Sequence, residues 1–266
     1  MLCRGMLKLM ASPELIKENG VGILYLNSPS KRNSLTVQDM LLIRLLLEDQ
    51  DHSDIAALII TGKGKVFCAG ADFAEIVSIT RKNSKGNKSL SNDMSDLCDT
   101  IQNFPLPTIC AFNGNAYGGG VELACACDFR ISKLDLEIMV PPAKLGIHYH
   151  LNGIKRFLSI FDLQITRELL LLARKKYGEE LNKMGFLDQI VEEGDNVLET
   201  AKVFAKQFFY LSPTAVSGMK MTINDIEMAS EKKSVIAGRI QRCLASKDFQ
   251  EGIKSIAEKR IPNFKV

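Results

Sequence analysis

The segment PTICAFNGNAYGGGVELACACDFRIS, residues 107–132, decides the fold class of this chain of 266 residues. It opens with a short apolar run at residues 107–112, a pattern typical of a strand that is buried on both faces. A glycine-rich loop follows, and a helix is expected to begin near Gly118. Small residues let a ligand approach the backbone closely, and N–H groups at the start of a helix stabilise negative charge. The segment predicts a strand, a candidate ligand loop and a helix in succession.

Two phosphate-binding interpretations of this loop fail. Gly114 and Gly119 have the spacing of a Walker loop, but Gly120 and Val121 stand where lysine and serine or threonine are required. The glycine spacing also differs from that of a dinucleotide-binding fingerprint, and the loop does not follow a first strand. Neither motif therefore places a nucleotide phosphate on this loop.

The same alternation of strand and helix precedes this segment. The runs VGILYLN at residues 21–27 and IAALIIT at residues 55–61 predict strands, the second of them buried on both faces. Between them, Thr36 offers a helix N-cap with Asp39 three residues on, ahead of an apolar helix at about residues 40–48. Strand, helix and strand in this order predict an α/β fold.

Two more segments define the organisation of the chain. A second loop of small residues, FCAGADF at residues 67–73, also lies where a strand gives way to a helix. From about Gly194 the pattern changes to one helix after another, without a strand pattern. We therefore expect an α/β core that carries two candidate ligand loops, followed by a helical C-terminal region.

Composition and charge narrow the class of protein. Hydrophobic residues make up 46% and charged residues 24% of the chain, which is ordinary for a soluble globular protein. A formal net charge of +3 is too small to indicate nucleic acid as a partner. No apolar run approaches the roughly 20 residues of a membrane-spanning helix, so we expect no membrane insertion.

The cysteines and the first residues of the chain indicate the cellular compartment in which the protein is expected. Seven cysteines are an odd count without disulfide or metal-ligand spacing, so we interpret them as reduced thiols in a cytoplasmic protein. Arg4 and Lys8 precede the first acidic residue, Glu14, but no continuous apolar run accompanies them. A secretory signal is therefore not expected, and an organellar location remains an alternative.

Five segments, in order along the chain, resemble the crotonase, or enoyl-CoA hydratase/isomerase, superfamily from about Gly20 to the C-terminus. They are KRNSL (31–35), TGKGKVFCAGADF (61–73), FNGNAYGGGVELACACDFRIS (112–132), PPAKLG (141–146) and DFQEGIKSIAEKRIPNF (248–264). The resemblance implies an α/β crotonase fold, a spiral of ββα units. It places the core with the active site at residues 1–194 and a helical trimerisation region at residues 195–266. A homotrimer or a dimer of trimers is therefore expected.

The resemblance also implies an enzyme of fatty acid metabolism that acts on acyl-CoA thioesters as a hydratase/isomerase-type lyase or isomerase. In such enzymes two backbone N–H groups hold the thioester oxygen as it becomes an enolate, and by position these belong to Ala71 and Gly119. Donors aimed at an oxyanion stabilise the transition state more than the bound substrate. The first catalytic glutamate of the family matches Glu122. No metal ion, and no cofactor beyond the CoA moiety of the substrate, is implied.

The CoA moiety is expected to contact backbone and basic side chains at six positions that match the family. These are Lys31, Arg32, Ala69, Ala71, Lys259 and Arg260. The first two lie near the nucleotide end, and the two alanines flank the pantetheine channel. The last two belong to the C-terminal tail. In an oligomer they would contact the CoA moiety that is bound to a neighbouring subunit. An exposed surface charge is the alternative interpretation of the four basic residues.

The second glutamate of the family's hydratases is missing. Its position matches Pro142, which neither gives nor takes a proton, so a hydratase or isomerase would work with the single glutamate Glu122. The segment after Pro142 resembles methylmalonyl-CoA decarboxylases of the same superfamily, in which Tyr149 matches the candidate proton donor or carboxylate-orienting group. That subgroup has histidine where this chain has Ala71. A malonyl-type (methylmalonyl or ethylmalonyl) CoA decarboxylase and a weakly or non-catalytic acyl-CoA-binding protein are therefore the alternatives.

Two of the three histidines, His148 and His150, follow Pro142 closely. In an extended segment they point to opposite faces, and no set of cysteines or carboxylates accompanies them, so no metal site is expected. In one interpretation one of them lines the acyl pocket beside Tyr149. In the other, both are polar side chains on a loop that prolines hold.

Overall fold

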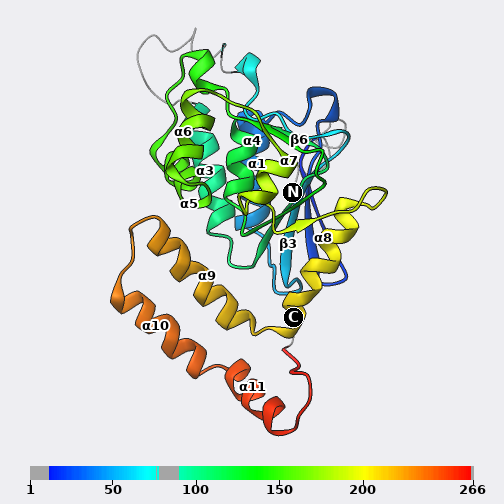
Figure 1. Cartoon of the computed structure of the whole chain (residues 1–266). Helices are drawn as coiled ribbons and strands as arrows, with labels where there is room; N and C mark the ends of the chain where they lie inside the picture. Colours follow the sequence, from blue (N-terminus) through cyan, green and yellow to red (C-terminus); the bar gives the residue numbers. More distant parts are fainter. Residues whose placement is uncertain (1–11, 76, 78–89, 265–266) are drawn as a thin grey trace, which may run out of the picture.

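The computed structural model describes residues 12–75, 77 and 90–264 of the chain (Figure 1). Arg4 and Lys8, which the sequence analysis used to judge a secretory or organellar targeting segment, lie outside these residues. In the described part of the chain, no helix combines the length and the apolar character that crossing a membrane requires.

The described core repeats a strand–strand–helix unit. The units are β1 (Glu14–Glu18), β2 (Val21–Leu26) and α1 (Val37–Glu48); β3 (Ala57–Gly62), β4 (Val66–Cys68) and α3 (Leu90–Gln102); β5 (Thr108–Ala111), β6 (Asn115–Tyr117) and α4 (Gly119–Cys125); β7 (Phe129–Ser132), β8 (Glu137–Met139) and α5 (Leu151–Ile160). In the last three units the first strand joins one sheet and the second strand joins another. The expected α/β spiral of ββα units is confirmed.

The first sheet has the strand order β1-β2-β3-β5-β7-β10, and the second has the order β4-β6-β8-β9. The remaining elements of this part are η1 (Pro29–Lys31), η2 (Pro142–Leu145), α6 (Leu163–Leu171), β9 (Lys176–Tyr177), α7 (Gly178–Lys183) and β10 (Gln189–Ile190). Strand β1 runs antiparallel to β2, and the other neighbours in the first sheet are parallel. The parallel strands therefore all end at one edge of this sheet.

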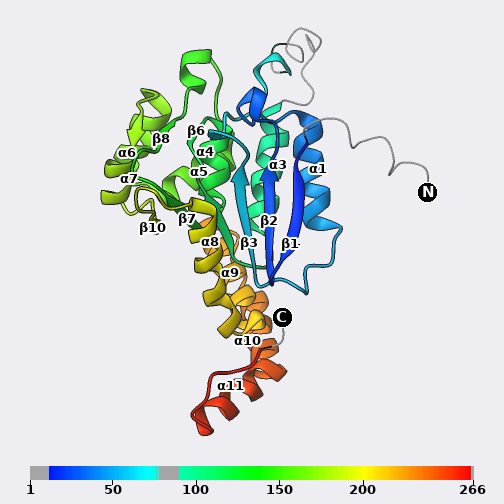
Figure 2. The ribbon, with the colours of Figure 1, turned by 90° about the vertical axis from the view of Figure 1, so that its right-hand side faces the viewer.

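Helices cover both faces of the first sheet, as Figure 2 shows for β2 and β3. All residues of β3 are buried, and they alternate between two apolar clusters. Leu58 and Ile60 pack in the larger cluster with residues of α1 and α3, whereas Ile59 packs in the smaller cluster with Ala201 and Ala205 of α8. Burial on both faces explains why this strand reads as a continuous apolar run.

The described chain beyond residue 194 is helical, as predicted. Its α-helices are α8 (Val197–Ala205), α9 (Pro213–Glu227), α10 (Lys233–Leu244) and α11 (Lys247–Ala257). Helix α8 lies against the first sheet, whereas α9, α10 and α11 extend away from it (Figure 1). Buried Lys220 fixes α9 to the core, donating to Asp128 at 2.7 Å and to the carbonyl of Leu106 at 2.9 Å. The proposed domain boundary at residue 194 stays a prediction.

Local signals in the sequence match the observed elements closely. Thr36 is the N-cap of α1 and forms a capping box with Asp39, although α1 begins at Val37, three residues before the expected start at 40. The predicted strands at 21–27, 55–61 and 107–112 correspond to β2, β3 and β5. The helix expected near Gly118 is α4, with Gly118 as its N-cap.

Candidate active site

The two loops of small residues touch at Gly70, in the loop after β4. Gly70 has a φ of +86°, and a Cβ atom built there would lie 2.8 Å from the carbonyl oxygen of Tyr117 and 2.9 Å from the amide nitrogen of Gly119. Side chains rarely adopt this φ, and real Cβ atoms do not approach backbone atoms this closely. Only glycine lets this loop close on the turn between β6 and α4.

At this contact, the N–H groups of Ala71 and Gly119 both lack a backbone hydrogen-bond acceptor among the described residues. Ala71 forms an isolated parallel bridge with Leu35, in which the amide of Leu35 donates to Gly70 and that of Asp72 donates to Leu35. Within the described residues, the N–H of Ala71 donates to no backbone carbonyl. Gly119 is the first residue of α4, where the helix itself supplies no acceptor. Two such N–H groups on touching loops can stabilise a developing oxyanion.

Glu122 lies one turn beyond Gly119 on α4 and is 0% exposed. Arg156 of α5 donates from Nη1 to Oε1 of Glu122 at 2.9 Å, and the side chain of Arg156 is also 0% exposed. His150 approaches the other oxygen, with Nε2 at 3.0 Å from Oε2. Both oxygens of the predicted catalytic carboxylate are therefore held by N–H donors.

Sequence analysis did not identify Arg156. Its Nε donates to the side-chain oxygen of Gln102 at 2.9 Å, and its second terminal nitrogen contacts Asp99. In the sequence it is a charged residue on the face of α5 that buries Gly153 and Phe157. A charge at such a position needs a buried partner, which was the available signal. The sequence did not say which carboxylate that partner would be.

Tyr149, the candidate proton donor, lies beside this carboxylate. Its ring stacks on His150 with centroids 5.3 Å apart and meets Phe157 edge-on at 5.5 Å. The residue is partly exposed, but burial of its hydroxyl raises the pKa of Tyr149 well above its usual value, and the charge of Glu122 raises it further. The hydroxyl therefore stays protonated at neutral pH and can donate a hydrogen bond.

The two histidines after Pro142 have different places. His148 is exposed, and its Nδ1 lies 2.6 Å from the carbonyl oxygen of Tyr149. His150, in contrast, contacts Glu122. Pro142 begins η2, between these histidines and β8. Among the described residues, no group of three or more histidine, cysteine, aspartate or glutamate side chains is arranged to hold a metal ion.

Some of the expected CoA contacts gather next to Ala71. The amide of Ala69 donates to the carbonyl of Arg32 at 3.0 Å, and the exposed side chain of Lys31 lies 3.4 Å from a carboxylate oxygen of Asp72. Their roles in CoA binding stay predictions.

Within one chain, Lys259 and Arg260 lie far from the other expected CoA-binding residues. They follow α11, which lies at the opposite end of the molecule from η1 in both views (Figures 1 and 2). Arg260 there pairs with Glu251 at 2.6 Å and with Glu258 at 2.6 Å. A CoA contact by these two residues would need another subunit.

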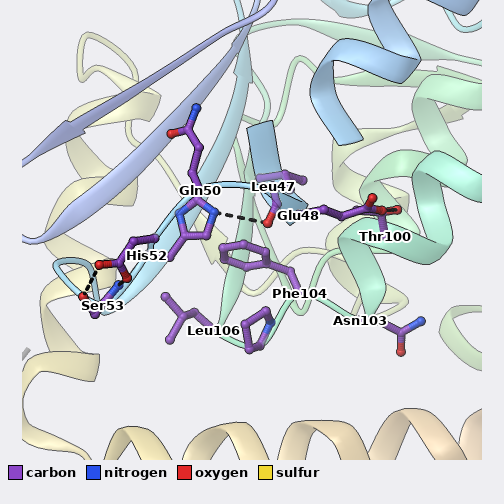
Figure 3. Close-up of a pocket in the computed structure, with 11 residues that line it drawn as sticks. Leu47, Glu48, Gln50, His52, Ser53, Thr100, Asn103, Phe104 and Leu106 are labelled. Carbon is purple, nitrogen blue, oxygen red and sulfur yellow. Dashed lines mark hydrogen bonds between the residues drawn. The ribbon is translucent and has the colours of Figure 1, made fainter. Parts of the chain in front are cut away.

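A cavity of about 580 Å³ lies elsewhere, between the ends of α1 and α3 and the start of β5 (Figure 3). His52 lines it and donates from Nε2 to the carbonyl of Leu47 at 3.2 Å, while its buried Nδ1 has no partner among the described residues. Burial lowers the pKa of His52, so its ring is neutral near pH 7. None of the predicted site residues lines this cavity.

Comparison with known proteins agrees with this fold. The described structure resembles that of an enoyl-CoA hydratase/carnithine racemase from Magnetospirillum magneticum, with a TM-score of 0.86 and 27% identity over 96% of each chain. The spiral of ββα units and this likeness identify the structure as a crotonase fold of the α/β class.

The sequence model of the enoyl-CoA hydratase/isomerase family matches residues 16–266, and the chain belongs to this family. It is 30% identical to a crotonyl-CoA hydratase of Syntrophomonas wolfei over 94% of this chain and 96% of that protein. It is 29% identical to a short-chain-enoyl-CoA hydratase of Clostridium acetobutylicum over 94% of this chain and 97% of that protein. The predicted superfamily is therefore confirmed.

Proposed function

We propose that this protein is an enzyme that acts on an acyl-CoA thioester, whose oxygen is held as an enolate by the amides of Ala71 and Gly119. Family membership and the hydratases named above support CoA thioesters as the substrate class. The observation that carries the proposal is the contact at Gly70, because it brings the two amide-bearing loops together. No cofactor beyond the CoA moiety of the substrate is part of this proposal.

Within this proposal Glu122 is the single proton-transferring carboxylate. In hydration, the oxygen of water bonds to the β-carbon, its proton passes to Glu122, and that proton then bonds to the α-carbon. In isomerisation, Glu122 takes a proton from the α-carbon and returns it at the γ-carbon. Hydration or isomerisation with one glutamate is the reaction that we favour, because Pro142 offers no second proton-transferring group.

Decarboxylation of a malonyl-type CoA is the second candidate. The bond from the α-carbon to CO₂ breaks, its electron pair enters the enolate, and a donor then protonates the α-carbon. No base is needed for this step, so the reaction does not depend on Glu122. The observation that favours this reaction is the place of Tyr149, whose ring stacks on His150 next to Glu122.

Two further features support a cytoplasmic homotrimer. The described cysteines are all free, as expected in a reducing compartment. Helices α9, α10 and α11 carry apolar side chains that are more than a third exposed, a pattern that marks an interface. They are Met219, Ile223, Ile226, Val235, Ile240, Leu244, Phe249, Ile253 and Ile256. Light scattering is expected to give a mass of three or six times 29.5 kDa.

Turnover of crotonyl-CoA and methylmalonyl-CoA, measured in parallel for the wild type, Glu122→Gln and Tyr149→Phe, tests the proposal. Loss of general acid–base catalysis is expected to slow hydration by about 10²–10⁴-fold in Glu122→Gln, with acyl-CoA binding retained. If methylmalonyl-CoA releases CO₂, and if Tyr149→Phe abolishes this release while Glu122→Gln does not, the protein is a decarboxylase and not a hydratase. Tight acyl-CoA binding without turnover of these or longer acyl-CoA substrates would indicate a binding protein.

A further inference from the structure

We infer that His150 is a positioning residue that fixes the carboxylate of Glu122 in its reactive orientation, so that one glutamate suffices where Pro142 removes the second. The inference rests on the proposed function of Glu122. Nε2 of His150 lies 3.0 Å from Oε2 of Glu122, which no solvent reaches because Glu122 is 0% exposed. The side chain of His150 is itself only 15% exposed.

The start of α5 fixes the tautomer of His150. His150 is the N-cap of this helix, and its Nδ1 accepts a hydrogen bond from the amide of Gly153 at 3.0 Å. A neutral imidazole that accepts at Nδ1 carries its proton on Nε2. His150 therefore donates to Glu122, and the helix cap sets the direction of that hydrogen bond.

The rings of Tyr149 and His150 pack directly against Gly153. A Cβ atom built at Gly153 would lie 2.5 Å from Cε1 of Tyr149 and 2.9 Å from Cε1 of His150. Both rings thus occupy the space that any side chain at this position would need. The two rings also stack on each other, with an interplanar angle of 28°.

Arg156 alone does not determine the orientation of the carboxylate. It holds Oε1 at 2.9 Å, and the contact on the other oxygen, Oε2, comes from His150 at 3.0 Å. The fixed orientation is inferred from both contacts together. A single carboxylate that takes a proton at one position and returns it at another depends on this alignment, because small displacements of a reacting group slow the reaction strongly.

Two substitutions of His150 separate its role as the N-cap of α5 from its role as the hydrogen-bond donor to Glu122. In His150→Asn, the amide oxygen lies about where Nδ1 lies and can still cap α5, but the side chain is too short to reach Glu122. In His150→Gln, the amide nitrogen reaches about as far as Nε2 and can donate to Glu122, while the cap is weakened. Turnover of crotonyl-CoA, acyl-CoA affinity and thermal unfolding are measured for both variants and the wild type.

The hydrogen bond to the charged carboxylate sets the expected effect. Loss of it in His150→Asn is expected to lower kcat by about 10- to 150-fold, with KM within about threefold of the wild type. His150→Gln is expected to recover most of kcat, although its helix cap is poorer. A structural role alone would give the opposite order, since asparagine is the better cap.

Two results would overturn the inference. One is a kcat of His150→Asn within about twofold of the wild type, and the other is a His150→Gln variant that folds and yet is as slow as His150→Asn. Glu122→Gln on the same substrate distinguishes this failure from failure of the proposed function. If Glu122→Gln keeps full turnover, the role of Glu122 itself is wrong, whereas an inactive Glu122→Gln with an active His150→Asn contradicts the role of His150 alone.

Gly153→Ala gives an independent test by packing. The added methyl group is expected to displace both rings and to lower kcat at least as much as His150→Asn does. Gly252→Ala in α11 is the matched control, because a Cβ there meets nothing within 4 Å. A kcat of Gly153→Ala equal to that of Gly252→Ala would show that the ring positions do not matter for catalysis.

Discussion

Replacement of Gly70 by alanine separates the two amides on which the proposed reaction depends. The new methyl group would have to lie 2.8 Å from the carbonyl oxygen of Tyr117 and 2.9 Å from the amide nitrogen of Gly119. Both are backbone atoms, so no side-chain rotation can relieve the contact. The loop that carries Ala71 must move away from the start of α4, and the oxyanion site opens.

The size of the effect follows from two contributions. A residue with a Cβ at positive φ costs roughly 1–2 kcal/mol in the folded state, which lowers stability. Displacement of one oxyanion donor costs about 2.7–4 kcal/mol in the transition state, which lowers kcat by about 10²–10³-fold. The first contribution acts on folding, whereas the second acts on catalysis only after the protein has folded.

Gly185→Ala is the control that separates these contributions. Gly185 has a φ of +73°, close to the +86° of Gly70, but a Cβ there meets nothing within 4 Å. Thermal unfolding and kcat with crotonyl-CoA are measured for both variants. Both are expected to be destabilised, and only Gly70→Ala is expected to lose turnover. A folded Gly70→Ala with kcat within about threefold of Gly185→Ala would refute the assignment of the oxyanion site to these loops.

Two further predictions concern the C-terminal helices. Lys220→Met removes the donor to Asp128 and Leu106 and is expected to destabilise the protein by about 1–3 kcal/mol in denaturant unfolding, whereas the exposed Lys254→Met is expected to change it by less than about 0.5 kcal/mol. Hydrogen bonds from Arg260 lower the pKa of Glu251 to about 2, below an unfolded value of about 4.3. Its stabilising contribution is thus full above the unfolded pKa and lost as pH falls toward 2. The amide signal of Asn263, which donates to Glu251, is expected to report that titration, and a midpoint near 4 would contradict the contact.

Local signals predicted the fold and the loops because short-range physics determines them. The capping box at Thr36 and the continuous apolar run of β3 need only neighbouring residues to be interpreted. The two candidate loops followed from their small residues and from the family motifs, and their role as an oxyanion site stays a prediction. The positive φ of Gly70 and its contact with the turn before α4 came from the structure.

The environment of Glu122 was not available from sequence. Arg156 lies 34 positions away along the chain and His150 lies 28 away, so their contacts with Glu122 exist only through the packing of α5 on α4. From the sequence, it stayed open whether one of the two histidines lined the acyl pocket. The helix that begins at Leu151 makes His150 a cap and turns its Nε2 inward.

The buried charges around Glu122 are better explained by orientation than by stability. Desolvation of two ions offsets most of their attraction, so apolar residues of similar volume in place of a buried ion pair often leave a protein equally or more stable. Arg156 is nevertheless held by Glu122, by Asp99 and by Gln102, each a separate constraint on one guanidinium. A rigid cation of this kind fixes one oxygen of Glu122 in space, and a neutral donor from His150 fixes the other. In the proposed reaction, the cluster would give Glu122 the fixed position that proton transfer by a single carboxylate requires.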